Sequence, residues 1–425
     1  MTAALMTGSL LLLLGMLAGV KWVARRAELH PEVARKIIHV GLGLYCLTLP
    51  FLFDQPAPVL GICGGAMLVL LGIRFAKDRN AGLGAGLHGV ARHSYGELLF
   101  AASVGLLFVL AQDDVVTYLV PLAILTLSDA AAALVGVRYG RARFRIEDGE
   151  KSVEGAVIFL LTAWILTMSL LLAFSDAPPL NVIVLGCLIA LYGTLVEASS
   201  WRGWDNFFLP MAICIVLKNN LDAPPGLLLE GAAIGTGALA AMILARRRLG
   251  LDTHAAGFLA TVLATIGMAS STWNVIVPTL AVASHLLVER MDREPHPAPH
   301  LRLSLVLVLL AFVWYLVGNL TPYPTVAAFN LSFAAFGIAL LAGRGHLWLA
   351  LTLVPVFLVA TGMRALLQMG GPPLDLAEIE LRVGVLVIAA LGAAIARKSA
   401  RPIGYEGLGF VAVAAGAATF GGTAL

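Results

Sequence analysis

The sequence is poor in charge for its length. Only 12% of its 425 residues are Asp, Glu, Lys or Arg, whereas a soluble globular domain carries about 25%. Hydrophobic residues make up 60% of the chain. A chain of this kind has too few charges to cover a water-exposed surface, so the composition excludes a soluble protein and indicates an integral membrane protein.

Long polar segments and a cysteine framework are missing as well. The longest polar stretch between apolar segments covers residues 74–95, which leaves no room for an inserted soluble domain. The four cysteines all lie in apolar segments, where a thiol acts as a small hydrophobic group, so we expect neither a disulfide nor a cysteine metal site. The first apolar segment lacks a preceding basic region, which favours a membrane helix with its N-terminus outside over a cleaved signal peptide.

Apolar segments recur along the whole chain, and about 20 such residues span a bilayer as a helix. We therefore expect an all-α, polytopic membrane protein with about 14–16 transmembrane helices. The segment at 205–217 is short enough to be re-entrant. The sixteen segments lie near 2–20, 37–53, 57–73, 96–111, 115–137, 153–174, 180–196, 205–217, 225–245, 254–272, 273–288, 303–318, 323–342, 346–366, 381–396 and 405–424.

Basic residues are concentrated in one alternate set of loops. These are the loops at 21–36, 74–95, 138–152, 197–204, 246–253, 289–302, 343–345 and 397–404, and they hold 25 of the 28 Lys and Arg residues. Basic loops stay on the cytoplasmic side of a membrane. The pattern predicts that these loops face the cytoplasm and agrees with an outside N-terminus.

The polar, proline-rich break at Leu221–Gly226 divides the chain. We expect a first membrane domain over residues 1–222, which contains almost every cluster of ionisable residues, and an additional helical domain over 223–425. In the second domain polar residues are sparse and scattered. We interpret this second domain as a helical scaffold, an oligomerisation module or a route for lipid access.

The stretch Ser128–Gly155 is the most informative part of the sequence. Asp129 lies inside an apolar segment, where a charge is costly and usually functional. Gly136 and Gly140 follow on the same helical face, which permits close approach by another helix or by a ligand. The alternative is that the small residues serve only to pack this helix against another, and that Asp129 forms a salt bridge.

Further polar groups begin or end other apolar segments on the same predicted side. Lys151 and Ser152 open a helix, whose free N–H groups suit a phosphate, although an interface lysine followed by a serine cap is a common pairing. Lys36 and His39 share a helical face with Arg35. These residues either bind a phosphate or extend to the lipid headgroups at the membrane surface. Glu97, Glu197 and Asp205 are acidic residues at the ends of predicted helices. They are either exposed to solvent or, if they face a phosphate together, ligands for Mg²⁺.

Taken in order, these segments resemble the motifs of the polyprenol/phytol/dolichol kinase family of integral membrane enzymes, over roughly residues 20–220. The matching segments are Arg35-Lys36-x-x-His39, Arg92–Glu97 (RHSYGE), Asp129-Ala-x-Ala with Gly136-x-Arg-Tyr-Gly140, Lys151-Ser-x-Glu-Gly155, and Glu197 with Asp205-Asn206. Ser128 stands where the family often has Gly.

The resemblance implies phosphoryl transfer, usually from CTP, to a lipid alcohol such as phytol, a polyprenol or dolichol, with Mg²⁺ as cofactor. It implies catalytic roles for Asp129, His39 and Glu97, and metal binding by Asp129, Glu197 and Asp205. The residues expected to bind the substrates are Arg35, Lys36, Arg92, Gly136, Gly140, Lys151, Ser152, Glu154, Gly155 and Asn206. We expect an enzyme of the plasma membrane with its active site facing the cytoplasm, in contact with membrane lipids and without a nucleic-acid partner; a homodimer stays open.

Two other functions compete with this interpretation. A phosphatidate cytidylyltransferase shares the pattern Gly-x-Arg-aromatic-Gly…Lys-x-x-x-Gly, but its closing signature of a Lys-Asp pair, PGHGG and Asp-Arg is absent from this sequence. A non-enzymatic transporter would carry broken helices, inverted repeats and a polar site at the membrane midplane. The charges in this sequence gather toward one face instead.

Overall fold

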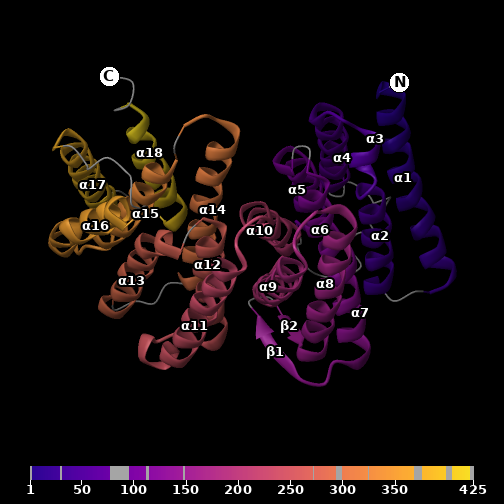
Figure 1. Cartoon of the computed structure of the whole chain (residues 1–425), viewed down its shortest axis with the longest axis horizontal. Coiled ribbons are helices and arrows are strands. Elements are labelled where there is room, and N and C mark those ends of the chain that lie inside the picture. Colours follow the sequence, from indigo (N-terminus) through magenta and orange to yellow (C-terminus); the bar gives the residue numbers. More distant parts are fainter. Residues whose placement is uncertain are drawn as a thin grey trace. The chain divides into compact units, whose positions relative to one another are not determined.

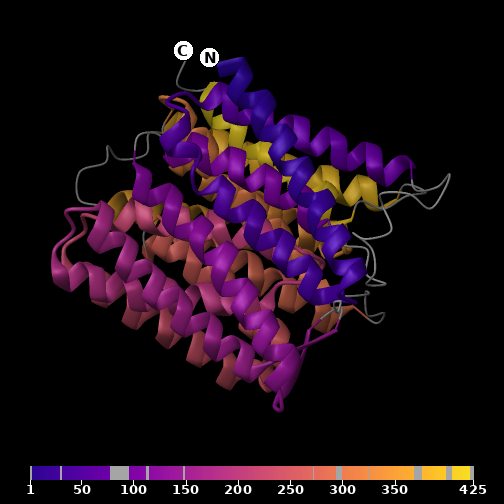
Figure 2. The same ribbon diagram turned by 90° about the vertical axis from the view of Figure 1, so that its right-hand side faces the viewer.

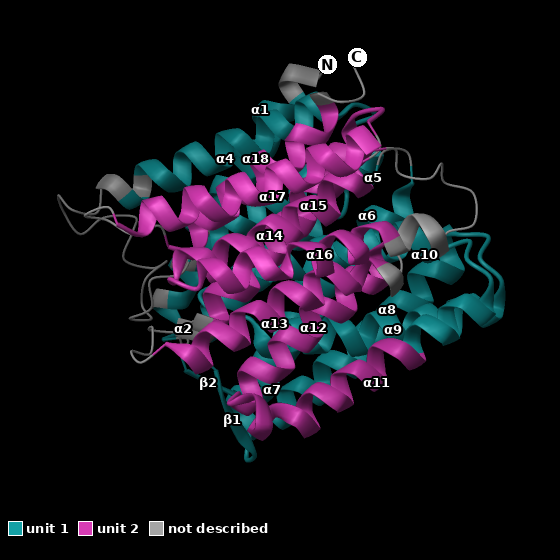
Figure 3. Ribbon diagram, turned by 90° about the vertical axis from the view of Figure 1, so that its left-hand side faces the viewer, with its two compact units in different colours: residues 1–232 teal, residues 233–425 magenta. Residues whose placement is uncertain are grey.

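The computed structural model describes residues 2–28, 31–76, 95–111, 114–146, 149–270, 272–292, 299–323, 325–367, 376–398 and 404–421. The chain forms two compact units, residues 1–232 and 233–425 (Figure 3). The boundary between these two units falls inside a helix, at residue 232. The proline-rich break at Leu221–Gly226 covers the turn before this helix and its first two residues.

Both units are built from helices (Figure 1). Unit 1 contains α1 (Thr2–Arg26), α2 (Pro31–Cys46), α3 (Leu49–Leu52), α4 (Pro56–Ala76), α5 (Gly96–Ala111), α6 (Val115–Ala123), a π-helical turn η2 (Ile124–Ser128), α7 (Asp129–Tyr139), α8 (Val153–Phe174), α9 (Pro179–Ser199) and α10 (Asp205–Asn220). Helix α11 (Pro225–Leu249) leads into unit 2, with α12 (Thr253–Ala269), a 3₁₀ turn η3 (Thr272–Val275), α13 (Ile276–Met291), α14 (Pro299–Leu320), α15 (Val326–Gly343), α16 (Leu347–Leu367), α17 (Leu376–Arg397) and α18 (Tyr405–Gly421).

The all-α, polytopic class expected from the sequence is confirmed. Within the described residues, every one of the sixteen expected apolar segments contains a helix, and eight helical spans are long and apolar enough to cross a membrane. Five shorter apolar helices accompany them. The protein is therefore a multi-pass membrane protein.

The most buried helices mark the centre of each unit. In unit 1, α6 is buried along nearly its whole length, and α10 packs against α5, α6 and α9. In unit 2, α15 is surrounded by α13, α16, α17 and α18. The sequence of α15 is apolar on every face, and a helix of that kind is stable only where neighbours cover it on all sides.

The segment expected to be a plain loop at 138–152 contains a β-hairpin, so that expectation was wrong. Strand β1 (Arg143–Ile146) pairs antiparallel with β2 (Gly149–Ser152), with Arg143 opposite Ser152 and Ile146 opposite Gly149. Arg143 and Arg145 are exposed, whereas Phe144 and Ile146 are half-buried, which is the alternation of a strand with one covered face. The hairpin extends beyond the ends of the surrounding helices (Figure 2).

Candidate functional site

Asp129 is the first residue of α7 and is held by two side chains of α2. Its Oδ2 atom lies 2.6 Å from Lys36 Nζ and 3.5 Å from His39 Nε2. The side chain of Lys36 is only 3% exposed. A buried lysine and a buried carboxylate are each unstable alone, so this ion pair fixes both side chains in the packed structure.

The π-helical turn before Asp129 sets the position of His39. In this turn the Asp129 N–H reaches back to the Ile124 carbonyl, one residue farther than in an α-helix. His39 Nε2 lies 2.9 Å from the carbonyl oxygen of Leu125, in the same turn. A carbonyl can only accept, so Nε2 carries the hydrogen, and His39 orients the segment that carries Asp129. Single π-helical turns of this kind occur frequently at functional sites.

A second ion pair joins the hairpin to the end of α9. Lys151 Nζ lies 2.7 Å from Glu197 Oε1 and also donates to the main-chain carbonyl of Glu197. Burial on its own lowers the pKa of Lys151, but the carboxylates of Glu197 and Asp205 outweigh burial and raise this pKa above its ordinary value. The ammonium group of Lys151 therefore stays charged at neutral pH.

Asp205 reaches the same place from the start of α10. The chain enters α10 through a tight turn in which Arg202 and Gly203 have φ angles of 52° and 84°, so both lie in the left-handed region. Asp205 Oδ1 accepts the Asn206 N–H at 3.1 Å. The turn thereby directs the first carboxylate of α10 toward the end of α9.

The three carboxylates of Asp129, Glu197 and Asp205 form one group. One oxygen atom from each lies within 4.8 Å of the others. Within the described residues, Glu197 Oε2 is buried without a hydrogen-bond partner, while Oε1 is paired with Lys151. Unpaired carboxylate oxygens are the ligands that a hard divalent cation such as Mg²⁺ prefers, so these residues fit the metal expected from the sequence.

Glycines bring α7 and α8 close together beside this group. A Cβ atom on Gly155 would lie 2.8 Å from the main-chain oxygen of Ala132, and one on Gly136 would lie 2.8 Å from Ser152 Oγ. A Cβ on Gly140 would lie 2.7 Å from Ser152 Cβ. The small face predicted on α7 is therefore used for contact with the start of α8, which is the helix-packing alternative.

The N–H groups at the start of α8 are largely taken by the chain itself. Ser152 Oγ accepts the Gly155 N–H at 3.0 Å, and the Val153 N–H is donated to the Ala142 carbonyl at 2.8 Å. Ser152 thus caps the helix. In this arrangement a phosphate would be held by side chains such as Lys151 more than by the helix terminus.

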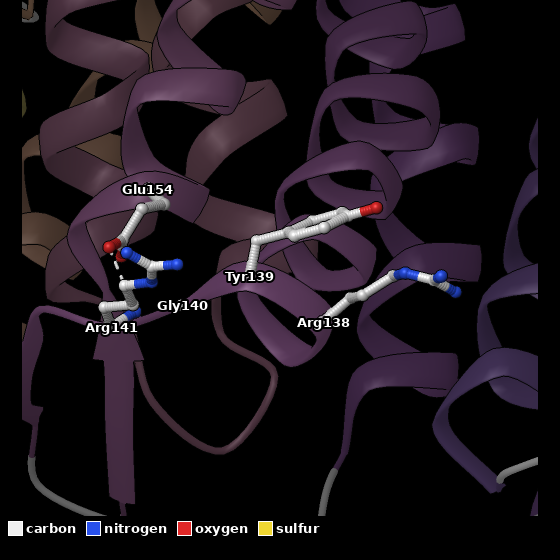
Figure 4. A pocket seen from close by; sticks show the side chains of 5 residues that line it. All are labelled: Arg138, Tyr139, Gly140, Arg141 and Glu154. Atoms are coloured by element: carbon white, nitrogen blue, oxygen red, sulfur yellow. Dashed lines mark hydrogen bonds between the residues drawn. The ribbon is translucent and has the colours of Figure 1, made fainter.

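A surface pocket of about 430 Å³ lies where α7 meets the hairpin. It is lined by Arg138, Tyr139, Gly140, Arg141 and Glu154. Figure 4 shows Glu154 turned toward the backbone of Arg141, with the Tyr139 and Arg138 side chains extending in another direction. Glu154 Oε1 accepts the N–H groups of Arg141 and Ala142 at 2.9 and 3.1 Å. The sequence prediction included Gly140 and Glu154 but missed Arg138, Tyr139 and Arg141 as pocket residues.

The remaining expected site residues lie at the same end of unit 1 or outside the described residues. Glu97 is half-buried in the first turn of α5, next to Tyr95, whose N–H is donated to the Arg202 carbonyl at 3.3 Å. Asn206 is buried, and its Nδ2 lies 3.3 Å from the Gly203 carbonyl. Arg35 is exposed on α2, and Arg92 lies outside the described residues.

Part of the chain is similar to a known enzyme. A curated protein named "Phytol kinase", from Synechocystis sp., is 32% identical over 196 residues. The matched region covers 45% of this chain and 81% of that relative. No protein-family model matches the chain. No solved structure matches it either.

Proposed function

This chain belongs to the polyprenol and phytol kinase family of membrane enzymes, and from that membership we propose that it transfers the terminal phosphoryl group of CTP to the hydroxyl of an isoprenoid lipid alcohol. The reaction would take place at the cytoplasmic face. Phytol and polyprenols are the proposed acceptors, since the similar curated protein is named for phytol and each of these alcohols presents one hydroxyl on a long apolar tail.

The observation that carries the proposal is how the three carboxylates are paired. Asp129 uses Oδ2 for Lys36, Glu197 uses Oε1 for Lys151, and Asp205 uses Oδ1 for the Asn206 N–H. Within the described residues, Glu197 also keeps its second oxygen, Oε2, buried without a hydrogen-bond partner. A phosphoryl-transfer site needs this combination of oriented carboxylates and fixed positive charge.

Asp129, Glu197 and Asp205 would hold Mg²⁺, which would supply charge neutralisation at the transferring phosphoryl group. Lys151 would add a point charge to the nucleotide phosphates, because its ammonium is already fixed beside Glu197. Asp129 Oδ1 would face the acceptor hydroxyl and take its proton. Lys36 acts through Asp129, since it holds the other oxygen, Oδ2, in place, and His39 acts through the turn before Asp129, since its Nε2 hydrogen is donated to the Leu125 carbonyl.

The pocket beside the hairpin offers a second group of nucleotide contacts. Arg138 and Arg141 are exposed cations at its rim, and Tyr139 supplies an aromatic ring. A nucleoside triphosphate carries several negative charges, so a pocket lined by two arginines suits it. This support is independent of the carboxylate group.

A double-label assay on the full-length protein in lipid nanodiscs tests the proposal. The protein is given CTP labelled at the α- or the γ-phosphorus, together with phytol, a polyprenol or diacylglycerol. We expect γ-label in a lipid monophosphate, release of CDP and no pyrophosphate. Incorporation of α-label with stoichiometric pyrophosphate would replace the kinase by a cytidylyltransferase. Lack of any CTP turnover with every acceptor would contradict an enzyme of either kind.

A further inference from the structure

Unit 2 contains a buried chain of four hydrogen-bonding side chains. Tyr405 Oη, at the start of α18, lies 3.3 Å from Glu289 Oε1 and 2.9 Å from His285 Nδ1, both of which belong to α13. His285 Nε2 lies 2.9 Å from His300 Nδ1, in the first turn of α14. The order along the chain of bonds is thus Glu289, Tyr405, His285 and His300.

The centre of this chain is sealed from solvent, and its ends are not. His285 is 0% exposed and Tyr405 is 2% exposed, whereas Glu289 and His300 are both half-buried. Ionisable groups inside a membrane protein are costly, and they commonly mark proton paths. Two solvent-accessible ends joined by two buried side chains are typical of a proton path rather than of a ligand cavity.

The donors and acceptors can be assigned from chemistry alone. An ionised Glu289 can only accept, so Tyr405 donates its hydrogen to Glu289. The remaining lone pairs of Tyr405 Oη then accept a hydrogen from His285 Nδ1. A neutral His285 leaves Nε2 as an acceptor, which receives the hydrogen of His300 Nδ1. Every bond therefore points the same way, from His300 toward Glu289.

The same four side chains can also form these hydrogen bonds in the opposite direction, with donors pointing from Glu289 toward His300. If His300 Nε2 gains a proton, its Nδ1 hydrogen can pass to His285 Nε2, the His285 Nδ1 hydrogen to Tyr405, and the Tyr405 hydrogen to Glu289. Each N–H or O–H bond that breaks is replaced by one that forms on the next group. One proton has then entered at His300, Glu289 has become a neutral carboxylic acid, and both histidines are neutral again.

We propose that Glu289, Tyr405, His285 and His300 form a proton relay, which carries a proton between His300 and Glu289 by reversing three hydrogen bonds together. The relay is separate from the phosphoryl-transfer site of unit 1 in sequence and in its residues. Both ends lie in or beside the 289–302 segment, which the distribution of basic residues predicts to be cytoplasmic. The protons would therefore be exchanged with the cytoplasm.

Fixed charges around the relay help to confine the proton to it. Arg344, at the end of α15, lies over the Tyr405 ring at 5.5 Å and is paired with Asp292 at 3.3 Å. Asp292 also lies 3.6 Å from His346 Nε2. The negative charge of the Asp252 carboxylate, which caps α12, electrostatically favours a proton on His300. A cation beside Tyr405 disfavours a lasting positive charge on His285, which favours transfer through neutral groups over a stored imidazolium.

The relay is tested on the full-length protein in nanodiscs, with histidines labelled by ¹⁵N, between pH 8 and pH 5. Solid-state NMR reports which nitrogen of His285 carries hydrogen, and infrared difference spectroscopy reports the carboxylic C=O band of Glu289, which Glu289→Gln identifies by removing it. We expect His285 to change from the Nδ1–H to the Nε2–H form with the same midpoint as the appearance of the Glu289 band. A His285 that keeps one form throughout, or that becomes an imidazolium, would overturn the proposal.

Tyr405→Phe removes the central hydroxyl and nothing else. In this variant we expect Glu289 to titrate without any change at His285, while Tyr323→Phe, on an exposed tyrosine outside the relay, leaves both signals as in the parent. Linked titration that survives in Tyr405→Phe would show that Tyr405 does not transmit the proton. Should Tyr405→Phe not fold, His300→Gln serves in its place, because Gln keeps the hydrogen bond but cannot take up the proton; His285 is then expected to keep its Nδ1–H form.

Discussion

At the scale of single residues, the pairing of Asp129 with Lys36 has two consequences that mutagenesis can separate. Asp129→Asn removes the charge proposed to bind Mg²⁺ or the hydroxyl proton, and it also leaves the buried Lys36 without a partner. We expect at least a hundredfold loss of turnover, about 2.7 kcal/mol in the barrier. Unpairing Lys36 also costs about 3–5 kcal/mol of stability.

A double variant tells these effects apart. Asp129→Asn combined with Lys36→Met leaves no unpaired buried charge, so thermal stability is expected to recover while turnover stays low. Asp176→Asn, on an exposed acid, is the matched control and should change neither quantity. Turnover at half the parent level in the double variant would make Asp129 a packing residue.

Glu197 offers a test of metal binding at the same scale. Its Oε2 atom is buried without a hydrogen-bond partner in the described residues, so Glu197→Gln takes away a ligand and keeps the shape. We expect the Mg²⁺ concentration for half-maximal activity to rise at least tenfold, about 1.4 kcal/mol. The measurement is a Mg²⁺ titration of turnover, with Glu230→Gln on an exposed acid as control. An unchanged Mg²⁺ requirement would remove Glu197 from the metal site.

At the scale of elements, the contact between α7 and α8 positions Lys151 and Asp129 together. Gly155→Ala places a Cβ atom 2.8 Å from the Ala132 carbonyl, and this backbone atom cannot move alone. We expect a loss of about 1–3 kcal/mol in stability, together with reduced turnover. Thermal unfolding in detergent and the phosphoryl-transfer assay measure the two effects.

Gly193→Ala in α9 is the matched control for Gly155→Ala. Its added Cβ would meet its nearest neighbours, Leu209, Ile213 and Phe159, at 3.5 to 3.6 Å, which is ordinary van der Waals contact. Ala also has the higher helix propensity, by about 1 kcal/mol. Stability is expected to stay the same or to rise. Equal losses of stability in the Gly155→Ala and Gly193→Ala variants would show that α7 and α8 do not pack more closely at Gly155 than α9 packs against its neighbours at Gly193.

At the scale of the whole molecule, the charge distribution predicts one orientation in the membrane. Arg145 in the hairpin and Asp176 between α8 and α9 are both exposed and lie in neighbouring loops of opposite predicted side. Single cysteines at these positions, in a background lacking the four native cysteines, are labelled with an impermeant reagent in intact cells. We expect label at 176 and none at 145. The reverse result would invert the topology and place the proposed active site outside.

The helices and the membrane class follow from the sequence alone, because apolar run length decides both. The expected segments at 96–111 and 153–174 coincide with α5 and α8. The acids of the candidate site, Asp129, Glu197 and Asp205, were also identifiable, since a charge inside or beside an apolar run is conspicuous. The hairpin was missed although Asp148-Gly149 follows an alternating Arg-Phe-Arg-Ile segment, which is a hairpin signal.

Which charges pair was decided only by the tertiary structure. Lys36 and Asp129 are 93 residues apart in the sequence, and Lys151 and Glu197 are 46 apart. Residues of unit 2 that look scattered along the chain, such as His285 and Tyr405, meet across 120 residues. Periodicity and hydropathy act along a single helix, so they determine where a helix forms and which residues it carries. They hold no information about the neighbour that a buried polar group will meet, and that neighbour is determined when the helices pack and each buried charge must find a partner.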